Sequence, residues 1–171
     1  MAVIIAQERG NNFSTLQFLN LHAVCCIGLN GLTLNKIEGD NCTPIGTWPL
    51  RRVFYRADKQ DTPLTKLPLT RITERMGWCD DPKDGDNYNK LVELPYLYSH
   101  EKLWRNDDLY DIVVELGYNY LPPIKGRGSA IFMHLMAKDE SPTAGCISLR
   151  KDDLLELISM VDVNEILEIK A

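Results

Sequence analysis

Two residues of this sequence could act together as a nucleophile and its base. Cys146 lies in the stretch SPTAGCISL (residues 141–149), after a glycine and directly before an apolar run, and His134 ends the stretch SAIFMH twelve positions earlier. Thiolate is the reactive form of cysteine, and a free thiol with a pKa of about 8.5 is mostly protonated at neutral pH. A nearby imidazole lowers that pKa and carries protons to and from the reacting groups. The spacing therefore predicts a cysteine nucleophile with a histidine base.

The residues before Cys146 could stabilise the charge that such a reaction develops. Gly145 lets the backbone turn sharply, so that the amides of Ala144 and Gly145 can point at an oxyanion. Removal of one such donor typically costs about 3 kcal/mol. The alternative is that Cys146 is a buried, unreactive residue at the start of a strand, which is the commoner role of a single cysteine.

The segments that must position the pair are mostly β-type. Alternating or β-branched apolar runs predict strands, and a run at helical spacing from Leu154 to Val161, preceded by Asp152 and Asp153, predicts one clear helix. The expected strands lie in FSTLQFLNLHAVCCIGL, RRVFYRAD, LPLTRITER, LYDIVVELGYN, GSAIFMHLM and VNEILEIKA. EGDNCTPIGTWPL is expected to be a loop, and NG at 30–31 a hairpin-type turn. Residues 76–103 show little periodicity and are expected to form a long irregular excursion, which in a compact domain is usually functional. A mainly β domain with one or two helices follows.

Composition limits the classes of function. The chain has 171 residues, which favours one domain over 1–171, and its net charge of −5 argues against nucleic-acid binding. No apolar run reaches the roughly 20 residues that span a bilayer, and MAVIIA is too short for a secretory leader. We expect a monomer without a transmembrane segment.

No metal site or cofactor site is expected. CDDPKDGDNYNK places proline and leucine where a calcium loop needs ligands, and GRGS at 126–129 lacks the lysine of a phosphate loop. The five cysteines fit neither a zinc site nor a disulfide framework, and Cys25 and Cys26 are interpreted as buried apolar residues.

Five stretches together resemble the catalytic domain of L,D-transpeptidases of the YkuD type. They are GSAIFMH followed by TAGCISLRKDDLLELI, the upstream EGDNCTPIGTWPL, GWCDDP with a later YN, LWRNDDLYDIVVELGYN, and PP-x-x-GRGSAIF, which together cover most of the chain. The resemblance implies a β-sandwich or barrel-like fold. It also implies a bacterial acyltransferase of peptidoglycan biosynthesis, cell wall organisation and cell shape, located in the cell envelope. Stem peptides would be both donor and acceptor. Cys146 would form a thioester that an amine of a second stem resolves.

The match also has departures. The common signature Ser-His-Gly-Cys followed by Ile-Arg reads here Thr-Ala-Gly-Cys followed by Ile-Ser, so Ser148 replaces the arginine. Leu135 stands where relatives often have a polar residue that orients the imidazole, so that a backbone carbonyl would have to serve. Candidate substrate contacts are the guanidinium groups of Arg127 and Arg150, which can pair with carboxylates, Thr143 of the signature, and the aromatic residues Tyr55, Trp78, Tyr88 and Trp104, which are equally typical of a core.

Two other functions fit the same residues. Water could resolve the acyl-enzyme, giving an L,D-carboxypeptidase or another peptide hydrolase. The groove could also belong to a peptidoglycan-binding module without activity, in which Cys146→Ala would change no product.

Overall fold

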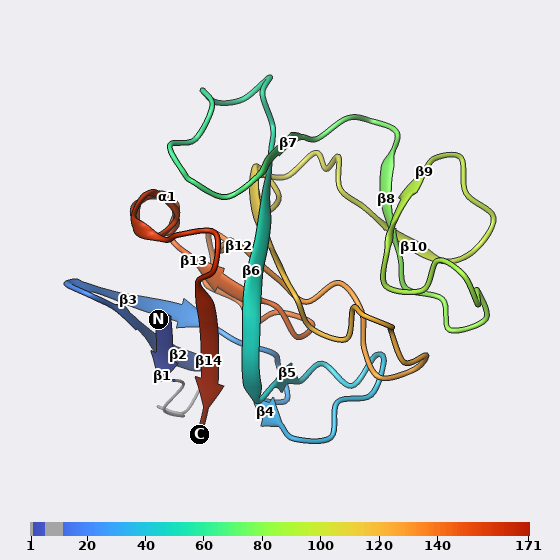
Figure 1. The fold of residues 1–171 in the computed structure, drawn as a ribbon, viewed down its shortest axis with the longest axis horizontal. Coiled ribbons are helices and arrows are strands. Elements are labelled where there is room, and N and C mark those ends of the chain that lie inside the picture. Colours follow the sequence, from blue (N-terminus) through green and yellow to red (C-terminus); the bar gives the residue numbers. More distant parts are fainter. Residues whose placement is uncertain (1, 6–11) are drawn as a thin grey trace.

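The computed structural model describes residues 2–5 and 12–171 and has a closed β-barrel at its centre (Figure 1). Within these residues the only regular helix is α1 (Lys151–Met160). The strands are β1 (Ala2–Ile5), β2 (Phe13–Phe18), β3 (Leu21–Cys26), β4 (Leu32–Thr33), β5 (Thr43–Pro44), β6 (Gly46–Tyr55), β7 (Leu69–Arg71), β8 (Met76–Cys79), β9 (Leu91–Glu93), β10 (His100–Lys102), β11 (Ile112–Leu116), β12 (Phe132–Leu135), β13 (Ile147–Leu149) and β14 (Ile166–Lys170). The expected mainly β, barrel-like fold is confirmed.

The long strand β6 closes the barrel. The sheet runs β11-β12-β13-β3-β2-β1-β14-β6-β7, and β6 also pairs with β11, which closes the strands from β11 to β6 into a ring and leaves β7 beside it. The first half of β6 pairs with β14 and its second half pairs with β11. The strand begins at Gly46, earlier than the expected RRVFYRAD, so the prediction that GTWPL is loop is wrong. Pro49 lies inside the strand because its carbonyl still accepts a hydrogen bond from the Gly117 N–H at 2.8 Å.

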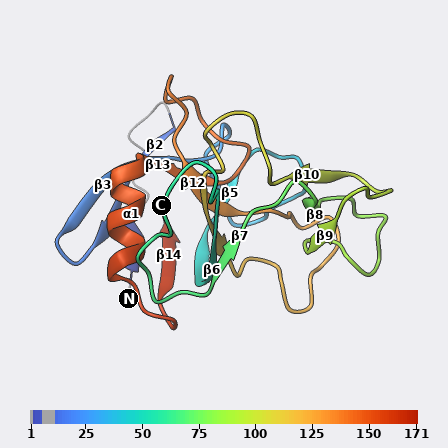
Figure 2. The same ribbon diagram turned by 90° about the horizontal axis from the view of Figure 1, so that it is seen from above.

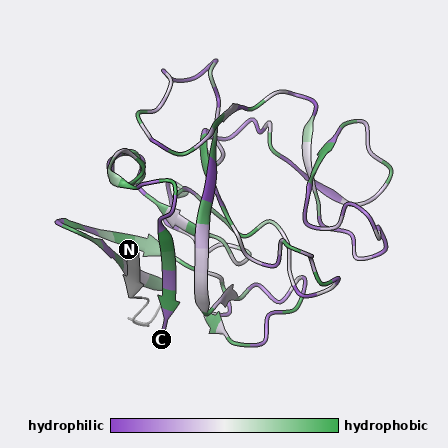
Figure 3. Ribbon diagram, viewed as in Figure 1, coloured by the Kyte–Doolittle hydropathy of each residue, from purple (hydrophilic) through white to green (hydrophobic). Residues whose placement is uncertain are grey.

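The barrel interior and the helix share one hydrophobic core. In β2 and β3 buried and exposed residues alternate, as a strand with one face on a core requires. Helix α1 lies against β3 and β12 and buries Leu154, Leu157 and Ile158, while Asp152 and Asp153 occupy its first turn as expected. Colouring by hydropathy shows β3 and β14 as largely hydrophobic segments (Figure 3).

A second, small sheet lies at the opposite end of the molecule from α1 (Figure 2). Strands β8, β9 and β10 form it within residues 76–103, so the expectation of an irregular excursion is wrong for these segments. Each of the three strands has only three or four residues, too few to produce a visible alternation. A second core cluster joins this sheet to the barrel through Trp78, Leu103, Phe132 and Cys146.

Candidate active site

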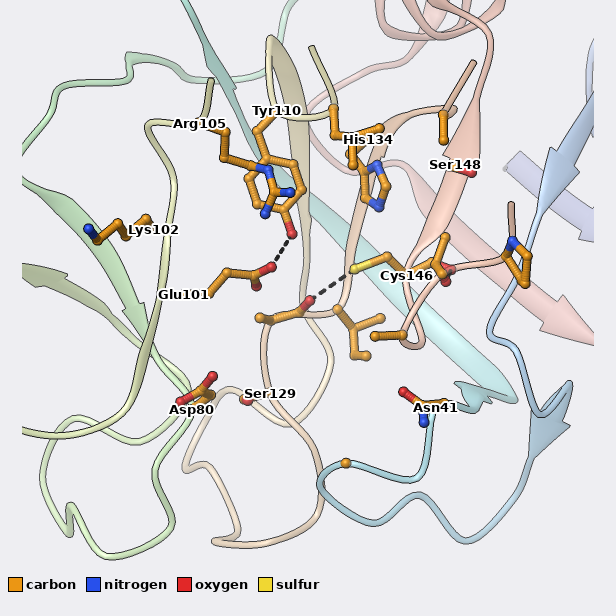
Figure 4. A pocket seen from close by; sticks show the side chains of 18 of the residues that line it. Asn41, Asp80, Glu101, Lys102, Arg105, Tyr110, Ser129, His134, Cys146 and Ser148 are labelled. Carbon is orange, nitrogen blue, oxygen red and sulfur yellow. Dashed lines mark hydrogen bonds between the residues drawn. The ribbon is translucent and has the colours of Figure 1, made fainter. Parts of the chain in front are cut away.

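Parallel strands bring the predicted base beside the predicted nucleophile. Strands β12 and β13 pair in parallel, with His134 opposite Ser148, and Cys146 directly precedes β13. Cys146 and Ser148 are two positions apart, so both side chains point to the face that carries His134. Figure 4 shows the imidazole and the sulfur facing one cavity. The two side chains therefore line the same cavity, and their roles as nucleophile and base stay a prediction.

The cavity measures about 600 Å³ and lies between the barrel and the small sheet. Its wall includes Cys146, His134 and Ser148 from the barrel side and Asp80, Glu101 and Lys102 from the side of the small sheet (Figure 4). Cys146 is 8% exposed and His134 is 7% exposed, so both groups are buried but open to this space. A peptide could therefore reach the sulfur only by entering the cavity.

The sulfur is held in its thiol form. The Cys146 Sγ–H donates to the Ala130 carbonyl oxygen at 3.1 Å, and the sulfur accepts a hydrogen bond from the Phe132 N–H at 3.4 Å. Burial, together with the negative charge of Glu101, raises the pKa of Cys146 to about 12. The free protein at neutral pH therefore carries a protonated thiol.

A backbone carbonyl orients the imidazole. Nδ1 of His134 lies 2.8 Å from the carbonyl oxygen of Leu135, and only a protonated nitrogen can bond to a carbonyl, so Nδ1 carries the hydrogen. Nε2 is then the proton acceptor. Burial lowers the pKa of His134 to about 4, which keeps the ring neutral at physiological pH. The aromatic ring of Tyr110 lies beside it, with 5.2 Å between the ring centroids.

A buried threonine fixes the loop that carries Cys146. Thr43 accepts a hydrogen bond from the Gly28 N–H at 2.8 Å and donates to the Gly145 carbonyl at 2.9 Å. Gly145 has φ +131°, and a Cβ there would lie 2.8 Å from the Cys42 carbonyl oxygen, so the turn before Cys146 requires glycine. Thr43 belongs to the segment CTPIG, one of the stretches that resemble the family, for which the sequence alone indicated no role.

The signature residues bond to one another. The Thr143 hydroxyl donates to the Cys146 carbonyl at 2.6 Å and accepts from the Gly145 N–H at 3.1 Å. Ala144 and Thr143 line the cavity. The Gly145 amide, one of the two expected oxyanion donors, is therefore engaged with a side chain in this conformation.

Most candidate substrate contacts lie elsewhere. Tyr55, Trp78 and Tyr88 are buried and do not line the cavity. The Trp78 indole packs on Phe132 and donates to the Asn89 side chain at 2.9 Å. Tyr88 reaches the cavity indirectly, because its hydroxyl donates to Glu38, which does line it.

The two candidate arginines also lie outside the cavity wall. Arg150 pairs with Glu140 at 3.0 Å, which ties the start of α1 to the loop that precedes Cys146. Arg127 is exposed in the turn before β12. Trp104 lies under the guanidinium of Arg56, which is 3.6 Å from its ring centroid.

Several residues of the cavity were not found by sequence reasoning. Glu101 and Asp80 lie on or beside short strands, in a region without periodicity, and nothing in their local pattern marks them. Tyr110 belongs to the quoted stretch LWRNDDLYDIVVELGYN, and its hydroxyl donates to Glu101. In the part of the chain that the structure describes, no three His, Cys, Asp or Glu side chains are grouped to hold a metal ion.

Comparison with known proteins identifies the family. The sequence profile of YkuD, the L,D-transpeptidase catalytic domain, matches residues 5–169. The chain belongs to this family, and the resemblance seen in the sequence is confirmed.

Two solved structures are similar to the chain. L,D-transpeptidase 1 of Mycobacterium tuberculosis is 14% identical with a TM-score of 0.42, and the match covers 99% of this chain and 59% of that one. An L,D-transpeptidase of Mycobacterium smegmatis has the same identity and TM-score, with 99% of this chain and 58% of that chain covered. The chain thus spans little more than half the length of these relatives. No curated protein matches.

Proposed function

We propose that this protein is a cysteine L,D-transpeptidase that joins peptidoglycan stem peptides through a thioester acyl-enzyme. The observation that carries the proposal is that His134 of β12 and Cys146, directly before the neighbouring strand β13, line one cavity of about 600 Å³. The family supports the reaction class. Residues 1–171 would act as one catalytic domain, as a monomer, and without a cofactor.

The first half of the reaction forms the thioester. As Sγ of Cys146 attacks the donor carbonyl, its proton passes to Nε2 of His134, which the Leu135 carbonyl leaves free for this purpose. Because thiol and imidazole are both neutral beforehand, proton transfer accompanies attack. Collapse of the tetrahedral intermediate breaks the C–N bond, and the proton on Nε2 leaves with the departing amine.

The oxyanion needs donors close to the sulfur. The amides of Ala144 and Gly145 lie in the turn directly before Cys146, and the Gly145 amide would exchange the Thr143 hydroxyl for the oxyanion. Thr43 keeps this turn in place through the Gly145 carbonyl. In the second half, an acceptor amine attacks the thioester, the C–S bond breaks, and the thiol is restored.

The test uses purified sacculi with the wild type and with Cys146→Ala. New muropeptide dimers with the wild type alone support transfer. New monomers shortened by one residue would instead mean that water resolves the thioester, as in a carboxypeptidase. No difference between the two proteins would contradict any enzymatic function and leave a binding module.

The substrate implies a location in the cell envelope. In the residues that the structure describes, no helix is long and apolar enough to cross a membrane. Fractionation of the native protein tests the location, and recovery only in cytosol would contradict it. Light scattering, which gives the molar mass in solution, tests whether the protein is a monomer.

A further inference from the structure

The two sides of the cavity differ in charge. On the barrel side, Cys146 and His134 are neutral at physiological pH. Away from this pair, the cavity is lined by three carboxylates: those of Asp80 and Glu101 on the side of the small sheet (Figure 4), and that of Glu38. We call this part of the cavity lining the acidic wall.

The cations that line the cavity do not neutralise the acidic wall. Arg105 is already bound in a two-bond pair to Asp107, at 2.9 and 2.6 Å. Lys102 is exposed and, among the described residues, forms no ion pair. The three carboxylates outnumber these two cations, and charges at the wall of a cavity interact more strongly than in bulk water.

Glu101 is held close to the catalytic pair. The Tyr110 hydroxyl donates to its Oε1, and the ring of Tyr110 packs against that of His134. One aromatic ring thus separates the carboxylate from the base. The second oxygen of Glu101 accepts no hydrogen bond from any residue in the described part of the chain.

Two further oxygens of this side lack a donor. Oδ1 of Asp80 and Oγ of Ser129 are buried and have no hydrogen-bond partner in the described structure, although both residues line the cavity. Ser129 is only 7% exposed. A buried polar atom without a partner typically costs about 1–3 kcal/mol, so a ligand that donates hydrogen bonds here would be favoured. A primary ammonium group offers three donors and no acceptor.

The electrostatics favour the same kind of ligand. Besides burial, the charges of Asp80 and Glu38 raise the pKa of Glu101, and Glu101 in turn raises the pKa of Cys146. The charge of Arg105 offsets part of this repulsion by lowering the pKa of Glu101, but Glu101 still faces the two like charges of Asp80 and Glu38. A cation bound among them would relieve the repulsion.

We propose that Glu101, with Asp80 and Ser129, forms the subsite that receives the primary ammonium group of the acyl acceptor. This inference rests on the proposed function, because an acceptor is needed only if a thioester forms. The subsite belongs to the second half of the reaction, because an ammonium group has to be held beside the site only once the sulfur is acylated.

Protons balance in this step. The acceptor ammonium loses two protons in becoming an amide nitrogen. One passes to Nε2 of His134 and then to Sγ of Cys146 as the C–S bond breaks. The other passes to the Glu101 carboxylate and from there to solvent. The C–N bond forms as the C–S bond breaks, so no oxidant or further reactant is required.

The test compares a charged with an uncharged acceptor. Muropeptide monomers serve as donor, and transfer to lysinamide, which carries ammonium groups at neutral pH, is measured beside transfer to hydroxylamine, which is largely uncharged there. Glu101→Gln and Asp80→Asn, made separately, remove one charge each and retain the shape of the side chain. Glu93→Gln is the matched control, because Glu93 is 73% exposed on the same small sheet and lies outside the cavity wall.

For Glu101→Gln we expect the half-saturating lysinamide concentration to rise about tenfold, and transfer to lysinamide to fall at least fivefold more than transfer to hydroxylamine. Asp80→Asn should act in the same direction, and Glu93→Gln should change neither acceptor. Equal losses for both acceptors, or no loss for lysinamide, would overturn the subsite. If the wild type shows no acyl-enzyme by mass spectrometry, the proposed function itself fails, and the subsite with it.

Discussion

The protonation state of Cys146 leads to a quantitative prediction for its reactivity in the absence of substrate. Because burial raises its pKa to about 12, the thiolate fraction at pH 7 is about 10⁻⁵, against about 3% for a free thiol of pKa 8.5. Thiolate is the species that iodoacetamide attacks. We therefore expect alkylation of Cys146 to be about three orders of magnitude slower than that of an unperturbed cysteine at the same pH.

The shape of the pH profile is the stronger test, because access to the cavity changes the absolute rate but not the slope. Alkylation of the Cys146 peptide, followed by mass spectrometry, should rise about tenfold per pH unit between about pH 5 and pH 10, without a plateau. His134→Gln should show a parallel profile, since a neutral imidazole does not stabilise the thiolate. A plateau around neutral pH in the wild type that disappears in His134→Gln would refute this reasoning, because it would reveal a preformed thiolate–imidazolium pair.

Three more variants test the structure around the pair. His134 should make the protein less stable in acid, because an unfolded histidine binds a proton near pH 6.5 and the folded His134 only near pH 4. As the pH falls between these values, the unfolding free energy of the wild type should drop by about 3 kcal/mol more than that of His134→Gln. Urea titration at several pH values measures this difference. A stability difference independent of pH would contradict it. Thr43→Val leaves the Gly28 N–H and the Gly145 carbonyl without their partner and should lower the unfolding free energy by about 2–4 kcal/mol, or Tm by about 6–12 °C. Thr43→Ser keeps the hydroxyl and should recover most of the loss. Equal melting of Thr43→Val and wild type would show that these two hydrogen bonds do not stabilise the fold. Gly145→Ala places a Cβ 2.8 Å from the Cys42 carbonyl at φ +131° and should cost about 2 kcal/mol or more in thermal unfolding, together with a loss of product formation on sacculi; an active, equally stable variant would show that the turn can relax.

The placement of His134 and Cys146 at one cavity was predictable because it depends on local order. His134 ends an apolar run and Cys146 begins the next, and two consecutive strands joined by a short connection commonly lie side by side. The orientation of the imidazole by a backbone carbonyl was predictable for a related reason: with Leu135 in the next position, no side chain was available, and Nδ1 bonds to the Leu135 carbonyl.

The acidic wall was not predictable, because it depends on long-range contacts. Glu101 reaches the cavity only because β10 pairs with β8 and because Tyr110, from the connection before β11, holds its carboxylate. Aromatic residues such as Trp78 and Tyr88 are common both in binding grooves and in cores, and here they bury their rings between the barrel and the small sheet. The closure of the barrel could not be predicted from the sequence either, because it depends on one strand, β6, that pairs with different partners along its length.

The carbonyl of Leu135 has a consequence for how this site can change. A hydrogen-bond acceptor that belongs to the main chain survives every amino-acid replacement at position 135 that keeps the strand. The tautomer of His134 is therefore guaranteed by the path of β12, and drift in the side chain at 135 leaves the base intact. A change that shifts the register of β12 against β13 would instead move His134 relative to Cys146, so the placement of this imidazole tolerates substitution at position 135 and is vulnerable to insertion or deletion in β12.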